Sequence, residues 1–102
     1  MRRRVVVTGI GTVNPLGLDV ASFWEAAQRG VSGVGEITAF DTSGFKVHIA
    51  AEIDDFDPEQ WIERREARRL DRYDQLFWAS TAQAMADSGL AYDEDDPAAL
   101  RA

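Results

Sequence analysis

The first thirty residues hold three patterns in an order that strongly limits the fold: a β-branched run, a glycine-containing loop and an amphipathic helix pattern. Residues 4–8 are Arg-Val-Val-Val-Thr, and an apolar run without alternation is typical of a strand covered on both faces. After the loop, Asp19 can cap a helix whose apolar residues recur every three to four positions, and Gly30 can end it. A strand, a glycine loop and a helix in succession predict an α/β fold.

The rest of the chain predicts one further strand and further helical segments. Residues 46–53 favour a strand, because apolar side chains alternate along them. The Asp-Pro pair at 57–58 predicts a short helical turn, and Asp71 begins a longer helix that ends at Gly89. Nearly every residue from 76 to 85 is apolar or small, so we expect that helix to be buried on most sides. Two strands give it too few partners, which predicts a piece of a larger fold.

The composition excludes several kinds of chemistry. The 102 residues include no cysteine and one histidine, so they build no disulfide, no thiolate nucleophile and no histidine-based metal site. In its strand segment, His48 is expected to be a surface or hydrogen-bonded residue. A net charge of -7 argues against a nucleic-acid partner. No apolar run approaches the ~20 residues of a membrane span, and we expect no signal peptide, because Thr8 and Gly9 interrupt the apolar run. We therefore expect a cytoplasmic protein with no membrane segment, metal or cofactor.

Two glycines before the first helix form part of a dinucleotide-binding pattern. Gly9 and Gly11 have the right spacing, but the pattern needs a third glycine where the chain has Asn14. Glu36 has the position of the acidic partner, although acidic residues are common throughout the chain. We interpret the glycines as allowing a tight strand-to-helix turn. Nucleotide binding is the alternative, and it predicts a thermal shift with nicotinamide or adenine nucleotides.

A basic cluster lies in the middle of the chain and consists of Arg64, Arg65, Arg68, Arg69 and Arg72. On one continuous helix, steps of about 100° would place all five within an arc of about 140°. Residues 61–72 carry a local charge of +2, whereas the rest of the chain carries -9. Such a face suits a specific acidic partner, or is a solvated face with ion pairs to Glu66 and Asp71. Glu66 would then point to the apolar side, which also predicts a break near Asp71.

Several short segments follow one another in a specific order and spacing, although no single segment is diagnostic of a protein family. They are Arg3 to Gly11, Asn14-Pro15-Leu16-Gly17, Phe23-Trp24, Gly30-Val31-Ser32-Gly33, Phe40-Asp41-Thr42-Ser43, Ala51-Glu52-Ile53 with Asp55-Phe56-Asp57, Arg69-Leu70-Asp71-Arg72-Tyr73, and Ala84-Met85 through Asp87-Ser88-Gly89-Leu90. Together they resemble the amino terminus of β-ketoacyl-acyl carrier protein synthases, and most closely the type II elongating enzyme of bacterial fatty acid synthesis. The resemblance covers essentially the whole chain.

The resemblance implies a thiolase-like fold of two similar α/β halves, paired as a homodimer in the full-length enzyme. The predicted fold class is therefore α/β, a partial thiolase-like fold with an incomplete N-terminal half of few strands with helices. Residues 1–102 would be an N-terminal fragment of the synthase N-terminal domain, with an acidic loop over 91–102 at the truncated end. The family joins acyl and malonyl-carrier thioesters by decarboxylating condensation, using one cysteine nucleophile and two histidines.

None of those catalytic residues is expected in this chain, so the fragment alone is predicted to be inactive. We predict a fragment of a 3-oxoacyl-[acyl carrier protein] synthase of fatty acid or polyketide synthesis. The resemblance also implies a basic patch that receives acyl carrier protein, and the matching residues are Arg64, Arg65, Arg68 and Arg69. Asn14 and Pro15 are interpreted as loop architecture. The alternative is a non-catalytic acyl-carrier-binding module, similar to a chain-length factor, which would lack the cysteine and histidines downstream.

Overall fold

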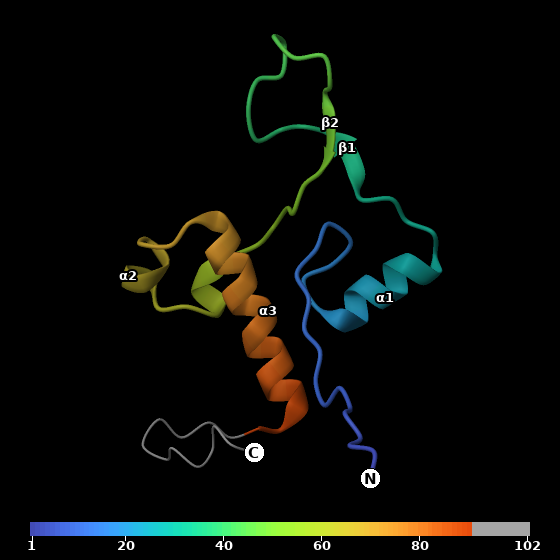
Figure 1. Cartoon of the computed structure of the whole chain (residues 1–102). Coiled ribbons are helices and arrows are strands. Elements are labelled where there is room, and N and C mark those ends of the chain that lie inside the picture. Colours follow the sequence, from blue (N-terminus) through green and yellow to red (C-terminus); the bar gives the residue numbers. More distant parts are fainter. Residues whose placement is uncertain (91–102) are drawn as a thin grey trace.

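The computed structural model describes residues 1–90, which form four helical segments and one small sheet. In chain order these are α1 (Val20–Gln28), β1 (Val34–Glu36), β2 (Ile49–Ala51), the 3-10 helix η1 (Pro58–Gln60), α2 (Arg64–Ala67) and α3 (Arg72–Ser88). The predicted acidic loop at 91–102 lies outside the described residues. Figure 1 shows α3 in the centre, with α2 on one side, the N-terminal segment and α1 on the other, and the β1–β2 hairpin extending away from both. The result is a small α/β piece.

The run at residues 4–8 is not a strand in the described part of the chain, so this prediction was wrong there. Its backbone has no hydrogen-bond partner among residues 1–90, and a strand requires a neighbour with which to form a ladder. Val5 and Val7 are 93% and 82% exposed. The β-branched pattern is present, but the second strand that it needs is not among these residues.

The N-terminal segment lies directly against the backbone of α3 at its two glycines. A Cβ at Gly9 would overlap the carbonyl oxygen of Ala84 and lie 2.5 Å from the backbone nitrogen of Ser88. A Cβ at Gly11 would overlap the carbonyl oxygen of Ser80. Neither glycine has a positive φ, so close backbone packing explains them better than the predicted tight turn.

Two side chains of α3 hold this N-terminal segment in place. The amide oxygen of Gln83 accepts a hydrogen bond from Thr12 N at 3.3 Å, and its amide nitrogen donates to Leu18 O at 2.8 Å. One turn further on, Asp87 Oδ2 accepts from Ile10 N at 3.0 Å. Helix side chains thus satisfy backbone groups of the loop that follows the predicted strand.

Helix α1 begins and ends where the sequence predicts. Asp19 Oδ1 accepts a hydrogen bond from Ser22 N at 2.8 Å, and Asp19 N donates to Ser22 Oγ at 3.4 Å, which completes a capping box. The hydrogen bonds that the carboxylate accepts from the Ser22 hydroxyl and backbone N–H stabilise its charged form, so they lower the pKa of Asp19. After the last turn, Gly30 has φ +70°, the left-handed conformation that favours glycine at a helix end.

The hairpin contains one predicted and one unpredicted strand. β1 and β2 are antiparallel, with Val34 opposite Ala51 and Glu36 opposite Ile49. The prediction over 46–53 is confirmed for its central residues, whereas β1 lies in a glycine-rich stretch that gave no strand pattern. In the loop between the strands, His48 Nδ1 and Thr42 Oγ1 share a hydrogen bond of 3.0 Å. His48 is thus an exposed, hydrogen-bonded residue, as expected.

Glu52, directly after β2, binds the first part of the loop that connects β1 to β2. Its carboxylate accepts hydrogen bonds of 3.1 Å from Thr38 N and Ala39 N, and one of 2.9 Å from Thr38 Oγ1. These bonds lower the pKa of Glu52 in the folded protein. A lowered folded-state pKa contributes stability above the ordinary glutamate pKa, and that stability is lost as the pH falls through the lowered value.

We therefore expect the contact between Glu52 and residues 38–39 to weaken on acidification, and Glu52→Gln to weaken it at neutral pH and to remove this pH dependence. Amide exchange and chemical shifts of Thr38 and Ala39, followed by NMR over the acidic range, measure the effect. Glu36→Gln is the matched control, because no hydrogen bond of that side chain is present among residues 1–90. The same pH profile in both variants would contradict the assignment.

The packed core of the described residues is small. Its buried apolar side chains are Ala26, Phe56, Ile62, Ala67 and Ala79. The predicted burial of α3 on most sides is wrong within this region, since Phe77 is 73% and Trp78 46% exposed. The Cα radius of gyration is 17.7 Å, whereas a compact domain of this length has about 13 Å. The elements that would cover α3 are not among residues 1–90, which explains the difference.

Helix α3 has the ends that the sequence predicts. Asp71 occupies the N-cap position with extended backbone, yet its side chain makes no capping hydrogen bond. At the other end Gly89 has φ +69°, and its N–H donates to Ala86 O. No helix within residues 1–90 combines the length and the apolar character that crossing a membrane requires.

Candidate functional site

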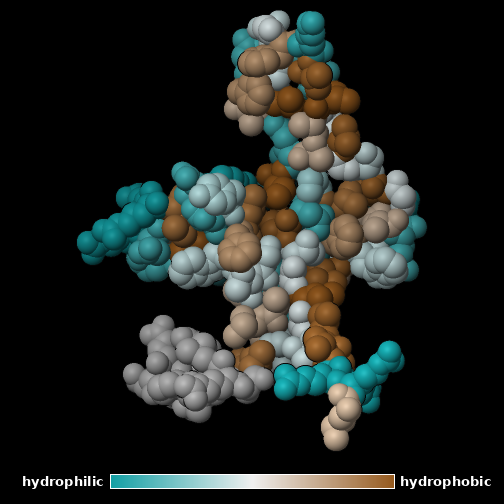
Figure 2. Space-filling view, in the orientation of Figure 1, coloured by the Kyte–Doolittle hydropathy of each residue, from teal (hydrophilic) through white to brown (hydrophobic). Residues whose placement is uncertain are grey.

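Four arginines lie on one helical turn and the turn that follows it; we call them the arginine surface. They are Arg64, Arg65, Arg68 and Arg69. All four are exposed, whereas Ala67 on the same turn is only 4% exposed. At about 100° per residue, the four side chains leave the turn within an arc of about 140° that faces away from Ala67. Figure 2 shows hydrophilic side chains gathered around the position of α2.

The sequence folds this way because short-range bonds and two buried side chains fix α2. Glu63 at the N-cap accepts a hydrogen bond from Glu66 N at 3.3 Å, and the turn continues past α2 as Arg69 N donates to Glu66 O at 2.9 Å. Ile62 before the helix is 3% exposed and anchors it together with Ala67. The arginines are thereby left on the outer side.

One ion pair is formed at this surface. Arg64 Nε lies 3.4 Å from Glu59 Oε1 on η1, and both side chains are more than half exposed, so the pair contributes little stability. The predicted ion pairs with Glu66 and Asp71 are not formed among residues 1–90. Within that part of the chain, the other three arginines of the surface have no carboxylate within 4.0 Å.

Arg72 does not belong to the arginine surface, although a continuous helix would have placed it there. The predicted break is confirmed, since α2 ends at Ala67 and α3 begins at Arg72. The Arg72 guanidinium instead donates to the carbonyl oxygens of Phe56 and Ile53, both at 3.4 Å, and lies 5.0 Å from the centre of the Phe56 ring. Its role is to hold the chain before η1.

Neither the pair Gly9 and Gly11 nor any cluster of metal-ligating side chains forms a second site in the described region. The backbone of α3 occupies the space beside Gly9 and Gly11, where a pyrophosphate would have to approach. Among residues 1–90, no three histidine, aspartate or glutamate side chains come together as a metal site would require. Packing therefore accounts for the glycines.

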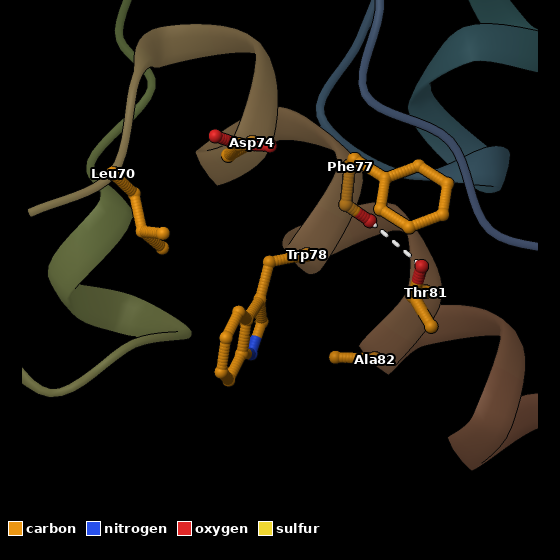
Figure 3. A pocket seen from close by; sticks show the side chains of 6 residues that line it. All are labelled: Leu70, Asp74, Phe77, Trp78, Thr81 and Ala82. Atoms are coloured by element: carbon orange, nitrogen blue, oxygen red, sulfur yellow. Dashed lines mark hydrogen bonds between the residues drawn. The ribbon is translucent and has the colours of Figure 1, made fainter. Parts of the chain in front are cut away.

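An open apolar hollow lies along α3 and at Leu70, and the sequence did not predict it as a surface feature. It measures about 310 Å³ and is shown in Figure 3. Its lining residues are Leu70, Asp74, Phe77, Trp78, Thr81 and Ala82. The five of them on α3 recur every three to four positions, which is the signal of one helix face, whereas Leu70 precedes the helix. The sequence predicts that this face is buried, whereas it lies open within residues 1–90.

Comparisons with known proteins agree over almost the whole chain. The family model described as "Beta-ketoacyl synthase, N-terminal domain" matches residues 2–100. A 3-oxoacyl-[acyl-carrier-protein] synthase 2 of Staphylococcus aureus (strain COL) is 41% identical over 93 residues, which is 91% of this chain and 22% of the relative. A protein of the same name from Coxiella burnetii is 46% identical over 93 residues.

The arrangement in space also has a solved counterpart. The structure titled "The ishigamide ketosynthase/chain length factor" superposes with a TM-score of 0.81 and 37% identity, over 89% of this chain and 23% of that one. The described residues thus have the fold of part of a ketosynthase, a thiolase-like α/β protein. The chain spans about one fifth of the length of the curated relatives it matches. Because the family model matches residues 2–100, the chain belongs to the β-ketoacyl synthase family.

Proposed function

We propose that the chain acts as the N-terminal part of a 3-oxoacyl-[acyl carrier protein] synthase, which joins acyl and malonyl groups in fatty acid or polyketide synthesis. The identity of 41% and 46% to two proteins named as such supports this activity. The chain itself holds no cysteine and one exposed, hydrogen-bonded histidine. Acyl transfer through a thiolate therefore needs residues outside these 102, and the chain alone is predicted to be inactive.

Within that enzyme, we infer that the arginine surface receives the acyl carrier protein. The observation that carries this inference is that all four arginines are exposed and three of them have no carboxylate partner among residues 1–90. Positive charges gathered on one side of an otherwise acidic protein attract an acidic partner and orient it during encounter. A homodimer and a cytoplasmic location remain predictions from the family resemblance.

The direct test is a calorimetric titration of the 102-residue chain with holo-acyl carrier protein, with circular dichroism to follow folding. We expect binding that weakens about tenfold or more between ~0.02 M and ~0.3 M salt, because exposed charges are screened over a Debye length of ~10 Å at 0.1 M. Binding that is indifferent to salt would contradict docking by the arginine surface.

The alternative, a non-catalytic carrier-binding module, makes the same binding prediction and needs a second experiment. Residues 1–102 can replace the matching segment of the Staphylococcus aureus relative, which is 41% identical to them. Condensation by this chimera would support an enzyme part. A folded chimera that binds carrier protein without condensing would favour the partner module.

A further inference from the structure

Side chains from the first turn of α3 form hydrogen bonds with both ends of the segment that carries the arginine surface. At its start, Arg72 donates to the carbonyl oxygens of Ile53 and Phe56. At its end, Gln75 Nε2 donates to Ala67 O at 2.9 Å and to Leu70 O at 3.5 Å. Two neighbouring side chains of one helix therefore hold residues 57–70 as a closed loop.

The bond from Gln75 joins α3 to the last residue of α2. A helix of four residues is far below the ~12 residues at which isolated helices become stable, so contacts from outside decide whether it forms. Ala67 ends α2, and its carbonyl oxygen accepts one hydrogen bond from Leu70 N at 3.2 Å in addition to the bond from Gln75. Gln75 is only partly exposed and supplies a donor at this point.

We propose that Gln75 is a positioning residue: by holding the end of α2, it fixes the direction in which the arginine surface is presented to its partner. The proposal rests on the docking function inferred above. Gln75 carries no charge, so it adds nothing to the attraction of an acidic protein. Its effect on binding acts through the arginines that flank Ala67, because a loose α2 must be ordered again when the partner binds.

The test compares Gln75→Leu with Gln28→Leu in the full chain. Leucine is a good helix former and lacks the donor, so α3 itself is preserved. Gln28 is an exposed residue at the end of α1 and serves as the matched control. One hydrogen bond to a backbone carbonyl changes an equilibrium about fivefold. We expect amides of residues 67–70 to exchange about fivefold faster in Gln75→Leu, with unchanged exchange in α1.

Carrier affinity is the second readout. We expect about fivefold weaker binding by Gln75→Leu and a much smaller effect of Gln75→Leu when Arg65→Gln and Arg68→Gln are already present. A merely structural role would reduce the affinity by the same factor in both backgrounds and would overturn the proposal. So would faster exchange without a change of affinity, or an α2 already unprotected in the parent chain.

The outcomes also separate this proposal from the docking function. A parent chain with a protected α2 but no salt-sensitive binding would overturn carrier docking, and with it the positioning role that depends on it. Docking that depends on Arg65 and Arg68 but not on Gln75 would overturn the positioning role alone. Both results come from the same set of variants.

Discussion

Gly11→Ala is expected to lower the free energy of unfolding by about 2–3 kcal/mol, the range of overpacking in a site that cannot relax. The new Cβ would overlap Ser80 O and lie 2.7 Å from Ala84 N. Both are backbone atoms of α3, and a helix backbone cannot move aside as a flexible side chain can. The N-terminal segment must therefore lift from α3, which breaks its hydrogen bonds to Gln83 and Asp87.

Urea unfolding followed by circular dichroism measures this change. Gly44→Ala is the matched control, because a Cβ at Gly44 meets no atom within 4 Å and its φ is not positive. We expect that control to remain within ~0.5 kcal/mol of the parent chain. Equal midpoints for the two variants would show that the N-terminal segment does not lie against α3.

The double charge reversal Arg65→Glu/Arg68→Glu is expected to weaken carrier binding by about 30-fold or more at low salt. Two exposed attractions become two repulsions, and each such interaction contributes ~0.5 kcal/mol or more. The fold should remain intact, since both side chains are exposed and make no ion pair among residues 1–90. Calorimetric titration at low and high salt gives the affinity, and the difference between variants should shrink at high salt.

A second double reversal controls for net charge. Arg29→Glu/Lys46→Glu replaces two exposed basic residues outside the arginine surface. Each reversal subtracts two charges, so both double variants change the net charge of -7 by the same amount. We expect the control to weaken binding severalfold at most. Equal losses of affinity in the two double variants would mean that net charge governs binding and that the arginine surface is not the docking site.

Local signals predicted the helices well. The cap at Asp19, the proline after Asp57 and the glycine at position 89 each set a helix end with residues a few positions away. β1 could not be predicted in the same way, because its pairing with β2 and not its own composition makes it a strand. The exposure of Phe77 and Trp78 depends on which segments cover α3, which no local pattern records.

The same distinction applies to the site. The spacing of the four arginines was enough to predict an exposed basic surface. Glu66 would lie on the apolar side of one continuous helix, and this was enough to predict a break before α3. The hydrogen bonds from Arg72 to the carbonyl groups of residues 53 and 56 could not be predicted, because they depend on how η1 packs against α3. Gln75 gave no signal either, since its bonds exist only once that turn has formed.

The contact between the N-terminal segment and α3 has a consequence during synthesis on the ribosome. The hydrogen bonds that fix residues 10–18 join groups 65 to 77 positions apart along the chain. At ~5–20 residues per second, their partners follow the first residues after roughly 4–15 s. Throughout that interval the run Val5 to Val7 emerges uncovered, with Arg2 to Arg4 directly before it. Neighbouring charges of one sign oppose association between nascent chains on the same messenger RNA, so Arg2 to Arg4 oppose pairing through this run, which α3 leaves exposed even after it has formed.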